Sequence, residues 1–317
     1  MAAPSFVIQS KDLEVEEGEE GLLGTGALGE VRRGRLHGAV VACKSLFLLR
    51  TDARAVAGFG GALRPEERRH LHAKFMQECT LMSSCRHPNI VPFFGVAVDD
   101  SAAREPRYLV MQYIDSGSLQ DLIHTPRYSA MRTDDACLPL EVQALALVGM
   151  FSALEYLASL HLIHRDVKPA NILAVVEEMQ LRKVLLADFG EAKQLSMTRA
   201  AATIAGTPLY MAPEMREEEE SKSPKAGVFS AGVVAVELNT GQMPRPGPEA
   251  RKVGRRREFV AEEERRANDI AAIRHPEISE LVQRCIVDDE ESVWTRRRSP
   301  SAAATFSERR ALRSRRP

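Results

Sequence analysis

The chain has 317 residues and a mass of 35.1 kDa; 44% of its residues are hydrophobic and 27% are charged. This composition is typical of globular proteins, so a small disulfide-stapled module, a wholly disordered chain and a fibrous chain are excluded. With 43 Lys and Arg against 44 Asp and Glu, the net charge of −1 points to neither nucleic acid nor an anionic membrane as a partner.

Residues 1–20 form an acidic lead-in, which we expect to be solvated, mobile chain. Its carboxylates are Asp12, Glu14, Glu16, Glu17, Glu19 and Glu20. From Gly21 to about Val110, short β-type runs broken by glycine predict a small sheet, in which Ala39–Ser45 is one strand.

One helix is predicted within this region. Glu66–Ser84 carries apolar residues at spacings of three and four, and Pro65 lies where helix starts favour proline. The preceding stretch, Thr51–Leu63, is rich in glycine and alanine, so we expect a long flexible connection there.

After a polar break at Asp115–Ser118, the pattern becomes helical. A long amphipathic helix is predicted from the apolar stripe formed by Val142, Leu145, Ala146, Gly149, Ala153, Tyr156, Leu157 and Leu160. Ile172–Val176 and Val184–Ala187 are suited to buried strands, and Val228–Leu238 to a buried helix. The remaining segments are a charged loop from Glu217 to Glu220, a solvated helix or loop at Arg251–Arg266, and an arginine-rich tail.

That tail covers residues 296–317, and we expect it to be solvated. A docking, nuclear-targeting or membrane-surface role for it stays open, because basic runs match such patterns easily.

We expect no signal peptide and no membrane-spanning helix, since charged residues or histidine interrupt the most apolar windows. The five cysteines contain no Cys-x-x-Cys pair, so neither a disulfide framework nor a zinc ribbon is predicted. An intracellular, cytoplasmic location fits these cysteines best.

Gly24, Gly26 and Gly29 form a Gly-x-Gly-x-x-Gly run, and such glycines let backbone amides approach phosphate oxygens closely. A Rossmann dinucleotide site would need a helix starting at this motif. Val31–Leu36 instead has the character of a strand that ends in a turn at His37–Gly38. A glycine-bearing hairpin is therefore predicted, and a dinucleotide-dependent oxidoreductase is rejected because no acidic residue follows at the required spacing.

Three further motifs follow in order. His164-Arg165-Asp166-Val167-Lys168-Pro169-Ala170-Asn171 matches a catalytic-loop pattern, and it is followed by Asp188-Phe189-Gly190 and by Ala212-Pro213-Glu214. With these motifs and Val41-Ala42-Cys43-Lys44, the sequence resembles the eukaryotic protein kinase family from about Phe6 to about Leu312. Each motif is common by chance, but the ordered set is specific.

The resemblance implies an α+β, bilobal protein-kinase-like fold, with kinase-domain boundaries at 21–312. A small N-lobe (21–111) would hold an antiparallel sheet and one main helix. A hinge (112–117) would lead to a larger, mainly helical C-lobe (118–312), whose end overlaps the basic tail.

The resemblance also implies an ATP-dependent serine/threonine kinase that uses ATP and Mg²⁺. Asp166 would accept or orient the proton of the substrate hydroxyl, while Asn171 and Asp188 would hold magnesium. Lys44 would bind the α- and β-phosphates and pair with Glu78.

The nucleotide would be enclosed by residues of both lobes. The resemblance assigns this role to Leu23, Gly24, Gly26, Gly29, Val31, Ala42, Lys44, Met111, Gln112, Ile114, Leu173 and Asp188. Met111 would be the gatekeeper, and the backbone of Gln112 and Ile114 would face the adenine. Met82, Phe93, His164 and Phe189 would stack into an apolar column that links the lobes.

Serine or threonine substrates are predicted from Lys168 and from the segment Gly206–Met211, in which Thr207 would brace the catalytic loop. The N-terminal sequence is similar to that of the tyrosine-kinase-like group. Arg165 suggests control by an upstream kinase, with Thr203 as the first candidate and Ser196 and Thr198 behind it. Unmodified hydroxyls at these positions stay the alternative.

The sequence departs from the family in three places. Leu28 replaces an aromatic residue at the tip of the glycine loop, and Gly227 replaces a buried aspartate that braces the catalytic loop, which leaves donors to satisfy at a cost of roughly 1–3 kcal/mol. The long connection before Glu78 would make its ion pair with Lys44 easier to break. Leu28 and Gly227 keep a pseudokinase, a binding or scaffolding module with little transfer, as the alternative. Arg298 is a loose candidate for the partner of Glu214.

Overall fold

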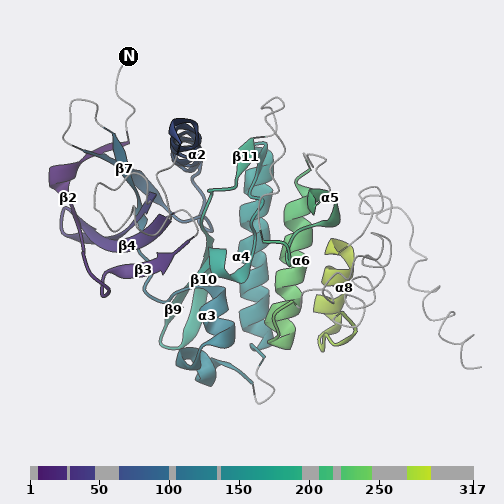
Figure 1. Cartoon of the computed structure of the whole chain (residues 1–317). Helices are drawn as coiled ribbons and strands as arrows, with labels where there is room; N and C mark the ends of the chain where they lie inside the picture. The colour runs from purple at the N-terminus through teal and green to yellow at the C-terminus, as the bar shows by residue number, and fades with distance from the viewer. Residues whose placement is uncertain are drawn as a thin grey trace, which may run out of the picture.

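A curled sheet and a mainly helical part make up the computed structural model (Figure 1). It describes residues 6–26, 29–46, 64–99, 105–133, 137–194, 207–216, 223–244 and 270–286. Four predicted segments therefore lie wholly outside the described residues: Thr51–Leu63, Glu217–Glu220, Arg251–Arg266 and the basic tail.

Seven strands form the sheet, in the order β1-β6-β7-β5-β4-β2, with β3 paired to β4. Their bounds are β1 Val7–Gln9, β2 Leu13–Val15, β3 Leu22–Thr25, β4 Gly29–Leu36, β5 Ala39–Leu46, β6 Phe93–Val98 and β7 Pro106–Gln112. All pairs are antiparallel except β1 with β6. The predicted α+β, bilobal fold with a small N-terminal sheet is confirmed.

The N-terminal segment is part of this sheet, so the expectation of a solvated, mobile lead-in is wrong for its described residues. β1 pairs with β6 and β2 pairs with β4, and only the short turn η1 (Ser10–Asp12) separates them. The carboxylate of Glu16 also bonds Arg33 at 2.7 Å. These two edge strands were not predicted, because their partner strands lie far away in the sequence.

The glycine run forms the predicted hairpin between β3 and β4 rather than the start of a helix. Gly29 is required there, since a Cβ at this position would lie 2.0 Å from the carbonyl oxygen of Ser45. Ala27 and Leu28, at the tip, lie outside the described residues.

Helix α2 (Pro65–Ser84) matches the predicted helix and starts with proline in its first turn. Its predicted apolar stripe faces the core, where Phe75, Cys79 and Met82 are buried. These side chains join one hydrophobic cluster that continues into the helical part through Phe189 and Leu157, so the two lobes share a core.

The helical part begins with α3 (Leu119–His124) and contains α4, α5, α6 and α8 in the described residues. Their bounds are α4 Leu140–Ser159, α5 Pro213–Arg216, α6 Lys225–Thr240 and α8 Pro276–Cys285. Figure 1 shows α4, α6 and α8 side by side. The predictions of α4 and of a buried α6 are confirmed, although α6 begins three residues before Val228.

Short strands and turns carry the functional segments of this part. β9 (Ile172–Glu177) and β10 (Gln180–Leu186) confirm the two strands that the apolar runs predict, and they form an antiparallel pair. β8 (Leu162–Ile163) and β11 (Lys193–Gln194) form another antiparallel pair. Two short helical turns, η3 (Pro126–Met131) and η4 (Pro169–Asn171), lie in the same part of the chain.

Among the described residues, α4 has the length and apolar composition of a membrane-crossing helix. In this structure it contributes buried residues such as Ala146, Ala153 and Leu157 to the core. The expected absence of a membrane span stays a prediction.

Candidate active site

One face of the sheet carries the side chains predicted to meet the nucleotide. Val31 pairs with Lys44 across β4 and β5, and Ala42 pairs with Met111 across β5 and β7. Because opposed residues in a sheet share a face, these four side chains lie together. The opposite face buries a second, smaller core of Val41, Cys43, Ala97 and Val110.

Lys44 lies between two carboxylates. Its Nζ is 2.7 and 2.9 Å from the carboxylate oxygens of Glu78 and 2.7 Å from Oδ1 of Asp188. Burial alone would lower the pKa of Lys44, but the two carboxylates outweigh it and raise this pKa above its ordinary value. Lys44 is therefore protonated at neutral pH. The ion pair between Lys44 and Glu78 forms in spite of the long connection before α2.

Asp188 is the more accessible of the two carboxylates, with 47% of its side chain exposed against 5% for Glu78. Burial would raise the pKa of Asp188, but the Lys44 ammonium outweighs burial and lowers it to about 2. Its backbone has φ of 60°, a region that non-glycine residues occupy at a cost. The chain thus places an ionised, partly exposed carboxylate opposite the sheet.

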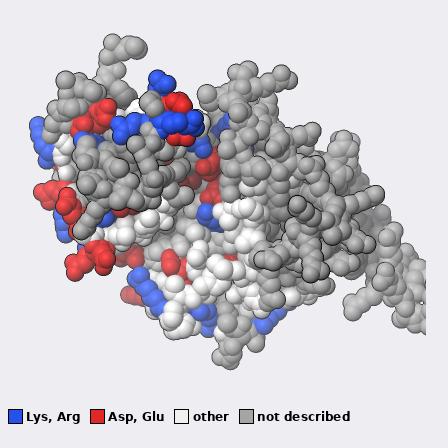
Figure 2. Space-filling view, in the orientation of Figure 1, with Lys and Arg blue, Asp and Glu red and all other residues white. Residues whose placement is uncertain are grey.

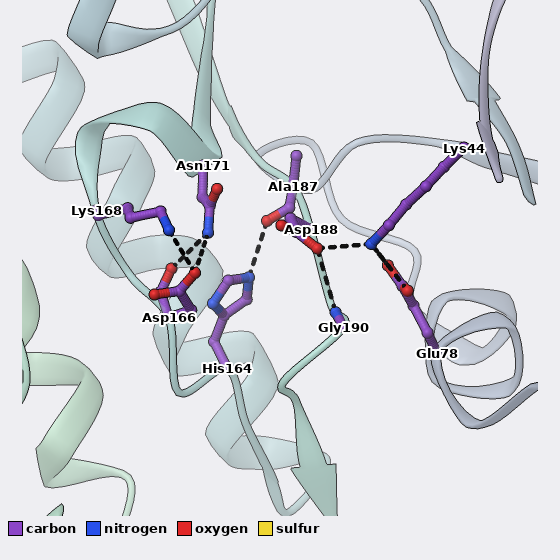
Figure 3. A network of polar contacts seen from close by, with 9 residues as sticks. All are labelled: Lys44, Glu78, His164, Asp166, Lys168, Asn171, Ala187, Asp188 and Gly190. Carbon is purple, nitrogen blue, oxygen red and sulfur yellow. Dashed lines mark hydrogen bonds and ion pairs between the residues drawn. The ribbon is translucent and has the colours of Figure 1, made fainter. Parts of the chain in front are cut away.

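A second cluster surrounds Asp166 (Figure 3). Its Oδ2 accepts hydrogen bonds from Lys168 Nζ at 2.8 Å and from Asn171 Nδ2 at 2.9 Å. Its Oδ1 accepts from the backbone N–H and the hydroxyl of Thr207, both at 2.9 Å. Lys168 also donates to the Thr207 hydroxyl at 2.8 Å, so three side chains fix the orientation of one carboxylate.

His164 and Ala187 lie between the two clusters (Figure 3). The His164 imidazole is 1% exposed, its Nε2 is 2.9 Å from the carbonyl oxygen of Ala187, and burial lowers its pKa. The neutral ring must therefore carry its hydrogen on Nε2 to donate to this carbonyl. His164 also meets Phe189 edge to face at 5.0 Å, within the predicted apolar column.

The other residues predicted to enclose the nucleotide differ in their exposure and in the backbone groups that they leave available. Leu23 is 41% exposed, whereas Leu173 packs against the main core. The N–H of Gln112 donates to the carbonyl of Pro92 at 2.9 Å, so only its carbonyl is left to face an adenine. Charged side chains gather at the junction of sheet and helical part, beside uncharged surface of the helical part (Figure 2).

Two oxygen-bearing side chains could hold a divalent cation here. The Asn171 amide nitrogen bonds Asp166, which leaves its carbonyl oxygen as the donor to a metal, and Asp188 offers an ionised carboxylate. Magnesium is bound by one or two such protein ligands together with phosphate oxygens, so this donor set fits it. Among the described residues, no group of three or more His, Cys, Asp or Glu could hold a metal alone.

Several predicted features lie outside the described residues. Thr203, Ser196, Thr198 and Arg298 are in this group, as is the side chain of Glu214. Arg165 is described, and its buried Nε has no partner among the described residues.

One buried polar group was missed by sequence reasoning. Glu237 in α6 contacts both His124 and Tyr210. The signal in the sequence was a glutamate within the apolar run Val228–Leu238, which cannot be buried without partners.

A family model described as "Protein kinase domain" matches residues 18–303. The probable serine/threonine-protein kinase roco5 of Dictyostelium discoideum is 26% identical over 243 residues, which make up 76% of this chain and 8% of that protein. Serine/threonine-protein kinase ATG1b of Arabidopsis thaliana is 29% identical over 227 residues, 71% of this chain and 28% of that protein.

Similarity extends to a bacterial protein. Serine/threonine-protein kinase PknB of Mycobacterium leprae is 31% identical over 231 residues, 70% of this chain and 32% of that protein. The chain thus spans less than a third of the length of each of these three relatives.

Proposed function

Because this chain belongs to the protein kinase domain family, we propose that it transfers the γ-phosphoryl group of ATP to serine or threonine hydroxyls of protein substrates. The observation that carries the proposal is the geometry of Asp166, which Lys168, Asn171 and Thr207 hold in one orientation. A carboxylate held in this way can accept a hydrogen bond from a substrate hydroxyl and take its proton.

The remaining residues supply charge and position. Lys44 would neutralise phosphate oxygens, and its ion pair with Glu78 holds the ammonium in place. Lys168, 2.8 Å from Asp166, would stabilise the charge that develops on the transferring group. Phosphoryl transfer is mainly positioning and charge neutralisation, and these residues provide both.

Asn171 and Asp188 would hold magnesium. When bound, the ion would neutralise the charge of the nucleotide phosphates. The low pKa of Asp188 keeps this carboxylate ionised at neutral pH, as a metal ligand must be.

The pseudokinase alternative rests on Leu28 and Gly227. A Cβ at residue 227 would meet only Leu154 within 4 Å among the described residues. The Lys44–Glu78 pair and the Asp166 cluster form in spite of Gly227, which favours the active enzyme. Among the described residues the buried Nδ1 of His164 has no partner, but it is the acceptor nitrogen of this tautomer and so is not one of the donors that Gly227 leaves to satisfy.

Three finer assignments belong to the same proposal. Membership of the tyrosine-kinase-like group is supported by the similarity of the N-terminal sequence to that group. Activation by an upstream kinase acting on Thr203 is supported by Arg165 Nε, which is buried without a partner among the described residues. A reducing, cytoplasmic location is supported by the five buried cysteines, which form no disulfide with one another.

The test is transfer of label from ATP in the presence of magnesium to a generic protein substrate. The wild type is compared with Lys44→Met and Asp188→Asn, each expected to lower the rate by orders of magnitude. Transfer that is equal in all three proteins, or absent from all three, overturns the proposal. Nucleotide binding without transfer supports the pseudokinase.

A further inference from the structure

The Arg32 guanidinium joins β4 to the turn that precedes β3. Its Nε donates to Oε1 of Glu30 at 2.5 Å, and its Nη1 donates to the carbonyl oxygens of Gly18 at 2.8 Å and Glu16 at 3.2 Å. The side chains of Arg32 and Glu30 are only 14% and 8% exposed, so salt screens this ion pair little. Arg32 is paired with Cys43 across β4 and β5, and therefore lies on the sheet face opposite to the nucleotide side chains.

The same turn is held from the other face by Arg33. Its Nε bonds the Glu16 carboxylate at 2.7 Å, and its backbone N–H donates to the Gly21 carbonyl at 2.7 Å. Gly21 packs so closely that a Cβ there would lie 2.5 Å from the carbonyl oxygen of Glu16. Residues 16–21 are thus fastened to β4 on both faces, directly before β3 begins at Leu22.

Arg32 lies at the base of the glycine hairpin, opposite a bulge. It is paired with Leu22, and the register of β3 against β4 shifts between Leu22 and Gly24. A bulge bends its strand and increases the local twist, so the hairpin changes direction here. Beyond the bulge the two strands stay joined, since the N–H of Gly26 donates to the Gly29 carbonyl at 2.8 Å. The angle at the base therefore sets the position of the whole hairpin.

We propose that Arg32 is a positioning residue for the nucleotide phosphates, because it fixes the angle of the glycine hairpin; this inference rests on the proposed function. Val31 lies between Glu30 and Arg32 and is paired with Lys44, the residue proposed to bind phosphate. Glycine amides can cradle phosphate oxygens only from the correct distance. Without the guanidinium, the Glu30 carboxylate and the carbonyls of the turn at residues 16–18 lose their shared donor, and the hairpin is free to bend at the bulge.

The test compares the affinities for MgATP and for adenosine by calorimetry, because adenosine has the same base and ribose but no phosphates. Arg32→Met, which keeps an apolar stem, is expected to raise the Kd for MgATP about 3- to 10-fold, up to the factor for one hydrogen bond to a charged group. The Kd for adenosine should change less than about twofold. Arg35→Met is the matched control: it removes the same charge from the far end of β4, where Arg35 bonds the Gly38 carbonyl at 3.4 Å, and should leave both affinities unchanged.

A second variant separates position from charge and keeps the test decisive if Arg32→Met folds poorly. Glu30→Met removes the carboxylate partner and should also weaken MgATP binding, whereas a pure charge effect would tighten it, because a negative charge is lost. Unchanged MgATP affinity in the folded variants, an equal rise in the Kd for adenosine, or tighter MgATP binding by Glu30→Met overturns the inference. A wild type that binds no MgATP overturns the proposed function instead.

Discussion

Thr207 shows how a single side chain fixes the orientation of Asp166. Its hydroxyl donates to Asp166 Oδ1 at 2.9 Å and accepts from Lys168 at 2.8 Å, while its backbone N–H supplies another bond to Asp166. The side chain therefore links the turn that leads to α5 to the loop that carries Asp166 and Lys168. Only the hydroxyl contacts depend on the side chain, so they can be removed separately.

Thr207→Val keeps the shape of the side chain but removes the hydroxyl. We expect kcat to fall about 10- to 100-fold, because a small misplacement of a catalytic group costs this much. Thr207→Ser, which keeps the hydroxyl, should retain most of the activity. Steady-state phosphorylation of a peptide measures both, and wild-type kcat in the valine variant would contradict the role.

The cysteine thiols are buried, so we expect them to react slowly with thiol reagents. Burial raises the pKa of Cys43 to about 12, and burial together with the Glu78 carboxylate raises that of Cys79 to about 12. At pH 8 only about one thiol in 10⁴ at each site is the reactive thiolate. The native protein should therefore react with an aromatic disulfide reagent far more slowly than protein denatured in guanidinium. Rapid labelling of Cys43 or Cys79, located by mass spectrometry in the native protein, would refute this.

At the scale of elements, Gly149 lies in the interior of α4 and Gly227 in the first turn of α6, and their surroundings differ. A Cβ at Gly149 in α4 would lie 2.7 Å from both Asn89 Nδ2 and Val184 Cγ2. A Cβ at Gly227 in α6 would meet only the end of the Leu154 side chain, at 3.3 Å. The first glycine is needed for close packing, whereas at the second only the flexible end of the Leu154 side chain has to move, by a few tenths of an ångström.

We therefore expect opposite results from the same substitution. Gly149→Ala should lower the free energy of unfolding by about 1–3 kcal/mol, because the new methyl group displaces Asn89 from its hydrogen bond to the Val184 carbonyl. Gly227→Ala should raise it by up to about 1 kcal/mol through helix propensity. Urea unfolding of both variants provides the measurement, and the reverse order of stability would show that these contacts do not control packing.

At the scale of the whole molecule, the N-terminal segment closes the sheet. β1 lies at one end of the strand order and β2 at the other, although three residues separate them in sequence. The sheet must therefore curl, and its concave side encloses the small core around Val41, Cys43 and Val110. Phe6 adds an edge-to-face contact with Phe93 at 5.8 Å, and its carbonyl accepts from Val96 at 2.8 Å.

Phe6→Ala should lower the free energy of unfolding by about 1–2 kcal/mol, less than for a fully buried phenylalanine because Phe6 is half-buried. Lys11→Ala, an exposed residue of the same segment, is the control and should change stability by less than about 0.5 kcal/mol. Chemical denaturation measures both. Equal stability of the two variants would mean that the segment does not support the sheet.

The sequence by itself determined the features whose signal is local. Apolar spacing predicted α2 and α4, and a continuous apolar run predicted α6. The run Val31–Leu36 with its turn at His37–Gly38 predicted a glycine hairpin instead of a dinucleotide fold. The order of short motifs identified the residues that form the Lys44 and Asp166 clusters. The helices and the hairpin depend on residues close together in the chain, so periodicity and turn chemistry reveal them. The roles of the site residues came instead from the resemblance to a family.

Only the tertiary structure decided features that join distant segments. The edge positions of β1 and β2, the left-handed backbone of Asp188 and the contacts of Glu237 have no local pattern. His124 and Glu237 are 113 residues apart, and Thr207 and Asp166 are 41 residues apart. Such contacts become favourable only when the folded core excludes water from them and fixes both partners, which the order of residues along the chain does not show.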